Sequence, residues 1–181
     1  FDLVEFHAAH GYGLNQWLSG ITNRRSDIYG CDQIGRTRLL VEIVESARRR
    51  HPQLLLSVRI PGQDFMDNGL KLSDSIQIAQ TLEKSGVDII HVSSGIGGWK
   101  RPDSRSGEGY LVADAEQIQA QVKHPVIGVG GIETGVFIDE SLQTNRLALA
   151  AVGRAILKDP SGWREKNMNQ NALSLSEGKE S

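Results

Sequence analysis

The chain has 181 residues, enough for one domain or a large part of one. Hydrophobic residues make up 39% and charged residues 23%, the balance of an ordinary soluble globular protein. The formal net charge of −2 argues against a dedicated nucleic-acid-binding protein, and the longest apolar runs are far too short to cross a membrane. A single cysteine, Cys31, excludes an internal disulfide and any multi-cysteine metal site.

Five short apolar runs predict buried strands, at residues 3–6, 54–60, 87–92, 126–129 and 147–152. Apolar residues at consecutive positions suit a sheet that is covered on both faces. Helical spacing predicts helices through residues 39–50, 73–85, 113–122 and 135–142, with Trp163 on a fifth. We expect Ser73 to cap the second helix and Gly86 to end it. Strands that alternate with helices predict a parallel sheet with right-handed crossovers.

Two architectures use this alternation, the closed (β/α)8 barrel and the open doubly wound sheet. The barrel is favoured because polar or glycine residues follow nearly every predicted strand, and no G-x-G-x-x-G motif is present. Only five strands are visible, so we expect residues 1–165 to form the last five units of an incomplete barrel, with three strands preceding Phe1. The alternative is that two chains pair through their sheets, so the sequence also allows a homo-oligomer. Residues 166–181 predict a polar, flexible tail, and a cytoplasmic location is the default expectation.

The segment His7-Ala8-Ala9-His10-Gly11-Tyr12 follows the first strand directly. Two imidazoles three positions apart could bind a metal ion or donate hydrogen bonds to a carbonyl oxygen that becomes negative during a reaction. Tyr12 could supply a proton, since a phenol with a pKa near 10 stays protonated at neutral pH. A carboxylate to complete a metal site is lacking, because Glu5 is expected to face away from the histidines. The alternative is a pair of loop histidines without a chemical role.

Arg59 ends the second strand, where strand alternation would direct it into the mouth of the barrel if Val58 faces the helices. A charged side chain there must be paired or must face an anionic ligand. The alternative is a buried ion pair, for example with Asp64 or Glu5.

Glycines end the last two predicted strands, in Gly128-Val129-Gly130-Gly131-Ile132 and Val152-Gly153-Arg154-Ala155. In (β/α)8 enzymes the loops after the seventh and eighth strands often bind phosphate through backbone N–H groups, which a side chain would hold off. Arg154 adds a guanidinium that matches phosphate oxygens. The alternative is glycine used only for tight turns. Ser94 and Gly95, after the third strand, could line the same cofactor.

Together these segments resemble the old yellow enzyme family of FMN-dependent NADH:flavin oxidoreductases, in order from Phe1 to about Trp163. The resemblance also includes the polar loop at residues 23–30 and the run at residues 86–88. It implies a (β/α)8 barrel with FMN at its mouth and NADH or NADPH as the hydride donor. The chain departs from the family pattern at Cys31, at Ile34-Gly35 and at the start of the last strand, Arg146-Leu147-Ala148.

The resemblance also implies a role for each residue. His7 and His10 match the pair that holds a substrate carbonyl, and Tyr12 matches the proton donor. Arg59 matches the arginine beside the flavin, and Gly131, Gly153 and Arg154 match the phosphate site, with Gly130 as a further cofactor-binding candidate. The implied reaction passes a hydride from NAD(P)H through FMN to an activated alkene, a small-molecule substrate.

Two rival functions remain. Another phosphate-binding barrel enzyme, such as a lyase or isomerase, would use the glycine loops equally but has less need of the histidines and Arg59. A truncated, catalytically incompetent paralogue would explain the absence of three strands, and residues 1–181 alone are expected to bind FMN poorly.

Overall fold

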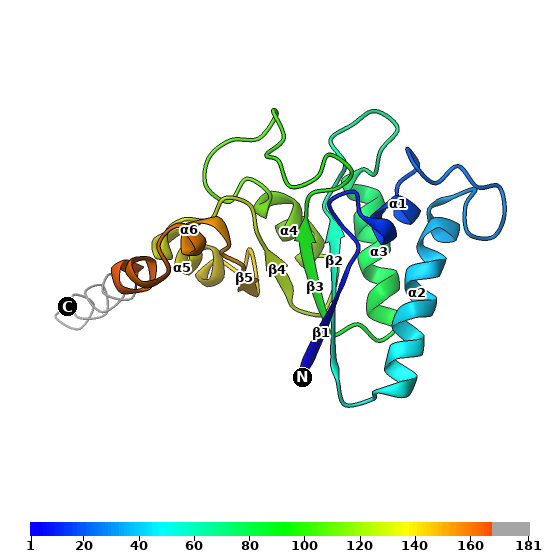
Figure 1. Ribbon diagram of the computed structural model, residues 1–181, viewed down its shortest axis with the longest axis horizontal. Helices are drawn as coiled ribbons and strands as arrows, with labels where there is room; N and C mark the ends of the chain where they lie inside the picture. The colour runs from blue at the N-terminus through cyan, green and yellow to red at the C-terminus, as the bar shows by residue number, and fades with distance from the viewer. Residues whose placement is uncertain (168–181) are drawn as a thin grey trace.

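The computed structural model describes residues 1–167 and contains one five-stranded parallel sheet (Figure 1). Its strands are β1 (Leu3–His7), β2 (Leu55–Pro61), β3 (Ile89–Ser93), β4 (Val126–Gly128) and β5 (Leu149–Ala150). Every strand is parallel to its neighbour, and the spatial order follows the chain order. All five predicted strands are present, but β5 has only two residues, because only Leu149 and Ala150 pair with β4.

The helices are α1 (Gly13–Leu18), α2 (Gln33–Arg50), α3 (Leu72–Lys84), α4 (Val112–Gln119), α5 (Gly135–Gln143) and α6 (Arg154–Lys158). The four predicted helices correspond to α2 through α5, and Trp163 lies in a further helical segment at residues 160–167. The short helices α1 and α6 were not predicted. None of the helices in residues 1–167 is long and apolar enough to span a membrane.

The N-terminus of α3 corrects one expectation. The helix begins at Leu72, and the Asp74 carboxylate accepts a hydrogen bond from the backbone N–H of Lys71 at 2.9 Å. Ser73 therefore lies inside the first turn, and its predicted capping role is wrong. The predicted end of this helix is confirmed, since Gly86 follows the last turn with φ +97°, a conformation that glycine adopts at little cost.

Alternation along the strands divides the sheet into an apolar face and a polar face. On β2, Leu56, Val58 and Ile60 are fully buried in the hydrophobic core with α2 and α3. Ser57 and Arg59 alternate with them and therefore lie on the opposite face. The helices pack against the apolar face and form the core with it, while the opposite face carries polar side chains.

The strand order, in which every strand neighbours the next one in sequence, is the order of a (β/α)8 barrel. In an open doubly wound sheet, the spatial order of the strands would instead reverse at a central strand. The long loops after β2 and β3 extend beyond the carboxyl ends of the strands (Figure 1). Apart from residues 166 and 167, the predicted tail lies outside the described residues.

Candidate functional site

All ten predicted site residues lie in or directly after the last residues of a strand. His7 ends β1, and His10 and Tyr12 follow it; Arg59 is near the end of β2. The remaining six residues follow β3, β4 and β5: Ser94, Gly95, Gly130, Gly131, Gly153 and Arg154. Parallel strands end at one edge of the sheet, so these residues share one edge.

A tight turn after β1 brings the two imidazoles together. His10 has φ 60° and Gly11 has φ 76°, and the backbone N–H of His10 donates to the Ser94 carbonyl at 3.0 Å. The His7 and His10 ring centroids are 5.0 Å apart, and the His7 and Tyr12 centroids are 5.6 Å apart. Tyr12 is 60% exposed, so its hydroxyl is available to a small molecule.

Arg59 is joined to the histidine turn through Ser93. Its Nη2 donates to Ser93 Oγ at 3.0 Å, and the same oxygen lies 2.6 Å from His10 Nε2. The buried Nε atom of Arg59 has no hydrogen-bond partner within residues 1–167. The ion pair that we considered, with Asp64 or Glu5, is not formed in this part of the chain.

Ser93 Oγ contacts both Arg59 and His10. Guanidinium is only a donor, so Ser93 Oγ accepts from Arg59 and can use its own proton to donate to His10 Nε2. In this arrangement a neutral His10 carries its proton on Nδ1, and that N–H is left to donate to a ligand.

Burial and the Arg59 charge keep both histidines neutral. Desolvation, followed by the repulsion of Arg59, lowers the pKa of His10 from 6.5 to about 4. The same two causes, in the same order, lower the pKa of His7. Burial also lowers the pKa of Arg59, while the Glu5 carboxylate opposes this shift. Neutral imidazoles beside a cation suit hydrogen-bond donation to a carbonyl oxygen better than proton transfer.

A second polar layer lies beneath this cluster. Glu5 Oε2 accepts from Ser57 Oγ at 2.9 Å and lies 3.0 Å from His91 Nδ1. Glu5 alternates with Phe6 and shares the polar face with His7, so the expectation that it faces away from the histidines is wrong. Burial opposes ionisation of Glu5, but the hydrogen bonds and charges of its neighbours lower its pKa overall.

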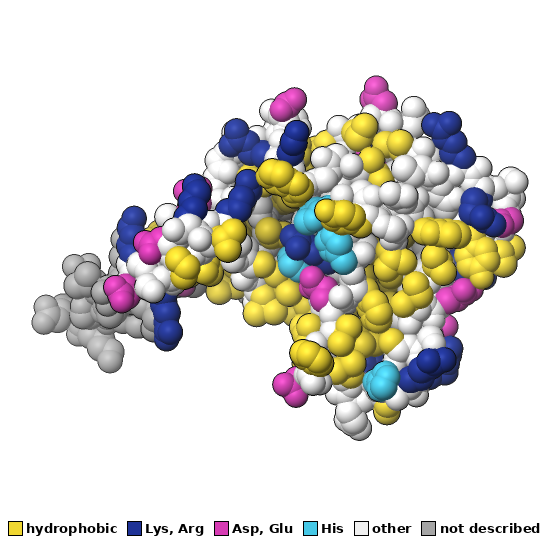
Figure 2. All heavy atoms as spheres, in the orientation of Figure 1, with side chains coloured by type: hydrophobic (Ala, Val, Ile, Leu, Met, Phe, Trp, Pro, Cys, Tyr) yellow, Lys and Arg dark blue, Asp and Glu magenta, His cyan; other side chains and the backbone are white. Residues whose placement is uncertain are grey.

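Sequence reasoning missed Glu5, Ser57 and His91 as a group. Their signal was present in the two-residue period: Glu5 precedes His7, Ser57 precedes Arg59 and His91 precedes Ser93 by two positions each. In the space-filling view, histidine side chains surround a basic side chain near the centre of one face, with acidic side chains directly below (Figure 2). No group of three His, Cys, Asp or Glu residues arranged to hold a metal ion is found within residues 1–167.

The glycine pair after β4 is explained by packing. Gly130 and Gly131 both have positive φ, and a Cβ on Gly131 would lie 2.8 Å from the Tyr110 ring. A Cβ on Gly130 would meet the backbone nitrogen of Leu111 at 2.9 Å. The need for glycine here is therefore accounted for by the turn and its neighbours.

Gly153, after β5, is different. A Cβ added there would have no atom within 4 Å, and its φ of −110° is open to other residues. Arg154 Nη2 donates to the Tyr110 hydroxyl at 2.8 Å, which ties the end of β5 to the turn after β4. Tyr110, which sequence reasoning did not single out, thus links both halves of the predicted phosphate site.

Ser94 and Gly95 hold the loop after β3 in place. A Cβ on Gly95 would lie 1.9 Å from Asp64 Oδ1, and the Asp64 carboxylate accepts from Ile96 N at 2.9 Å. The Ser94 hydroxyl donates to the Gly98 carbonyl at 2.5 Å. These contacts give Ser94 and Gly95 a structural role in addition to the predicted role of lining the cofactor.

Comparison with known proteins agrees with this geometry. The profile of the NADH:flavin oxidoreductase / NADH oxidase family matches residues 1–172. The chain is 39% identical over 160 residues to an NADPH dehydrogenase of Bacillus velezensis, covering 88% of this chain and 46% of that protein. It is 37% identical over 174 residues to an NADH oxidase of Thermoanaerobacter brockii, covering 92% and 26%. The chain thus spans about half the length of this dehydrogenase and about a quarter of the length of the NADH oxidase.

Solved structures show the same fold. Morphinone reductase in complex with tetrahydroNAD superposes with a TM-score of 0.70 at 25% identity, covering 92% of this chain and 44% of that chain. The old yellow enzyme homologue from Zymomonas mobilis superposes with a TM-score of 0.68 at 21% identity, covering 91% and 45%. The expected fold class, an incomplete (β/α)8 barrel of five βα units, is confirmed. The chain belongs to the NADH:flavin oxidoreductase / NADH oxidase family.

Proposed function

We propose that this chain provides the substrate-binding and proton-donating side of an FMN-dependent oxidoreductase that reduces activated alkenes with NADH or NADPH. The observation that carries the proposal is Arg59, a half-buried cation whose buried Nε has no hydrogen-bond partner within residues 1–167 and which lies beside two neutral imidazoles. A guanidinium that is partly withdrawn from water and has no anionic partner in the described part of the chain favours an electron-rich ligand. The family relationship supports flavin as that ligand.

The residues present fit FMN. The orphaned Nε of Arg59 offers a donor to an acceptor atom of the ring, and Gly153 leaves open space beside the backbone where a phosphate could approach. Arg154, held by Tyr110, adds a charged donor on the same side. FMN, when bound, supplies the hydride-transfer chemistry between NAD(P)H and the alkene.

The protein residues bind and polarise the substrate. His7 and His10 donate hydrogen bonds to the substrate carbonyl, which draws electron density away from the conjugated double bond. Their low pKa values keep them neutral, so they polarise this oxygen without protonating it. Arg59 would hold the flavin and supply positive charge there, which would favour the reduced, more electron-rich form of the cofactor.

Tyr12 completes the reaction. Hydride addition to the β-carbon leaves a pair of electrons at the α-carbon, and this carbon takes a proton from the Tyr12 hydroxyl. Tyr12 can reach a bound molecule because its ring is exposed beside His7. The phenolate that remains regains its proton from water.

Tyr12→Phe tests this assignment in the full-length protein. We expect the protein to carry FMN, and the variant to reduce an enone about 10²–10⁴-fold more slowly while NAD(P)H reduces the flavin at an unchanged rate. Stopped-flow absorbance of the flavin separates the two half-reactions. Equal loss in both would remove Tyr12 from the proton-donor role, and a full-length protein without FMN would overturn the function itself.

A further inference from the structure

We propose that Tyr110 is a positioning residue for the phosphate of FMN: its hydroxyl orients Arg154, and Arg154 binds the phosphate. Tyr110 lies in the loop after β3, two residues before α4 begins, and Arg154 is the first residue of α6. Arg154 Nη2 donates to the Tyr110 hydroxyl at 2.8 Å, across 44 positions of the chain. The inference rests on the proposed function for the identity of the ligand, and on these contacts for the role of Tyr110.

Tyr110 is packed against the turn after β4. The residue is 9% exposed, and its backbone N–H donates to the Gly130 carbonyl at 2.9 Å. Its ring approaches Gly131 so closely that a Cβ on this glycine would lie 2.8 Å from a ring carbon. The Tyr110 hydroxyl therefore has a fixed position beside the glycine turn that is predicted to bind phosphate.

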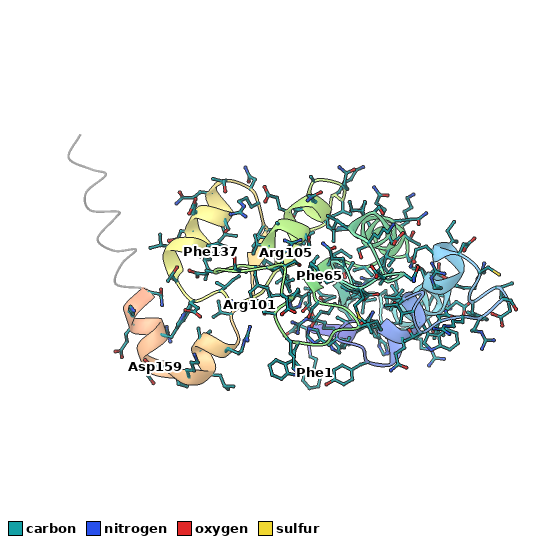
Figure 3. All side chains as sticks on the ribbon, turned by 90° about the horizontal axis from the view of Figure 1, so that it is seen from above. Phe1, Phe65, Arg101, Arg105, Phe137 and Asp159 are labelled. Carbon is teal, nitrogen blue, oxygen red and sulfur yellow. The ribbon has the colours of Figure 1, made fainter. Side chains whose placement is uncertain are left out.

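The two residues before Tyr110 fasten this part of the loop to the start of α5. The Glu108 carboxylate accepts from the backbone N–H of Thr134 at 2.6 Å and from its hydroxyl at 3.1 Å. Gly109 has φ +66°, and a Cβ there would overlap the ring of Phe137, which is labelled on α5 in Figure 3. Glycine thus allows the loop to pass close to α5, and the position of Tyr110 is set before any ligand binds.

A neutral hydroxyl holds Arg154 without cancelling its charge. Arg105, in the same loop as Tyr110, shows the contrast, because it pairs with the Asp114 carboxylate at 2.6 Å. Arg154 is exposed and forms no ion pair within residues 1–167. Guanidinium is only a donor, so the Tyr110 hydroxyl accepts from it and the positive charge stays available to an anion. This arrangement suits a phosphate ligand.

The hydrogen bond to Tyr110 also reduces the entropy that Arg154 loses when it binds a ligand. A free arginine side chain has many rotamers, and fixing them on binding costs affinity. Part of this cost is met in advance if the side chain is already held. Loss of the Tyr110 hydroxyl should therefore weaken binding of FMN about fivefold and leave binding of a flavin without phosphate unchanged.

Tyr110→Phe tests this expectation, because it removes the hydroxyl and keeps the ring that packs against Gly131. The full-length protein, freed of flavin, is titrated with FMN and with riboflavin, which has the same ring system and no phosphate. Flavin fluorescence gives both Kd values. We expect the Kd for FMN to rise about fivefold and the Kd for riboflavin to stay the same. Equal weakening of both flavins would overturn the proposal, because Tyr110 would then serve only the packing of the turn, and so would an unchanged Kd for FMN.

Tyr29→Phe is the matched control. The Tyr29 hydroxyl donates to Glu42 at 3.1 Å on the surface of α2, so its loss should leave the Kd for FMN unaltered. An equal rise of this Kd in Tyr29→Phe and Tyr110→Phe would overturn the proposal.

Arg154→Met shows whether Tyr110 acts through Arg154. Methionine is unbranched and donates no hydrogen bond, so the Tyr110 hydroxyl has nothing to orient in this variant. Adding Tyr110→Phe to Arg154→Met should therefore weaken FMN binding by less than about twofold. The full loss, about fivefold, in the Arg154→Met protein would overturn the role of Tyr110 as a positioning residue.

Inorganic phosphate separates this inference from the proposed function. Phosphate bound at Arg154 should raise the Tm of the flavin-free protein, and Tyr110→Phe should reduce that rise. A protein that behaves in this way but binds neither FMN nor riboflavin would overturn the proposed function and leave Tyr110 and Arg154 as a phosphate site. FMN binding with the same preference over riboflavin in Tyr110→Phe as in the unaltered protein would overturn the inference about Tyr110 alone.

Discussion

The side of the site formed by β1–β3 is built differently from the side formed by β4 and β5. On the first side, five residue pairs join β1 to β2 and five join β2 to β3, and Ser93 links Arg59 to His10. On the second side, two pairs join β3 to β4 and two join β4 to β5. There, the Arg154–Tyr110 hydrogen bond connects the two glycine turns.

This difference matches the tasks that we propose for each side. Polarising a carbonyl requires donors that are already oriented, because reorientation during the reaction costs rate. Holding a phosphate requires mainly backbone N–H groups and space, which short strands followed by glycine provide. Under the proposal, the substrate side therefore depends on side-chain contacts, and the phosphate side depends on open backbone space at Gly153 together with the Arg154 side chain.

The largest expected effect comes from Gly95→Ala, which disrupts the packing on the β1–β3 side of the site. The new Cβ would lie 1.9 Å from Asp64 Oδ1 and 3.1 Å from the Asp64 Cα atom, so the loops after β2 and β3 must separate. We expect the free energy of unfolding to fall by about 3 kcal/mol, from overpacking together with the loss of Asp64 hydrogen bonds. For a protein of this size, Tm should fall by about 6–12 °C, measured by thermal denaturation.

Gly97→Ala is the matched control in the same loop. A Cβ there has no atom within 4 Å, so Tm should change by less than about 2 °C. A similar loss of stability in both variants would show that the loop tolerates no added methyl group, and would remove Asp64 as the cause.

A smaller effect is expected from Gly153→Ala, which tests the β4–β5 side of the site. Since the new methyl group meets no protein atom, Tm should remain unchanged or rise slightly. The methyl group would, however, hold a phosphate away from the backbone, so the Kd for FMN of the full-length protein should rise about tenfold, or about 1.4 kcal/mol. Flavin fluorescence titration gives this Kd.

Gly13→Ala provides the comparison, because Gly13 is exposed at the start of α1 and its Cβ also meets nothing within 4 Å. The Gly13→Ala variant of the full-length protein should bind FMN with unaltered affinity. Equal FMN affinity of the Gly153→Ala variant and the unaltered protein would place the phosphate elsewhere and leave Gly153 without a role.

The sequence predicted most of this architecture because its strongest signals are local. Leu56, Val58 and Ile60 mark β2 by their composition alone, and the residues that follow each strand identify the functional edge. The Ser73 cap failed because Asp74 competes for the same turn through the Lys71 N–H, a choice between neighbours that composition does not decide.

The contacts that the sequence did not reveal join segments that lie far apart in the chain. Glu5 meets His91 across 86 positions, and Tyr110 meets Arg154 across 44. Such pairs depend on strand register and on the course of a long loop, which single-strand periodicity does not contain. Glycine in the sequence was equally ambiguous, because only the surrounding atoms separate Gly131, which packs against Tyr110, from Gly153, which faces open space.

The smallest expected effect is the pH dependence of the free energy of unfolding that arises from His10, on the β1–β3 side. The pKa of His10 falls from 6.5 to about 4 on folding, so the unfolded chain binds the extra proton, and stability is lost as pH falls from the unfolded pKa towards the folded one. We expect the free energy of unfolding to decrease by about 1 kcal/mol between pH values of about 7 and about 5, since solvent screens part of the shift. Denaturant unfolding at the two pH values measures it. His10→Asn is the control, because asparagine tolerates the φ of 60° but does not titrate. This variant should lose less stability over the same interval, and an equal loss in both proteins would mean that His10 is not held neutral by Arg59 and by burial.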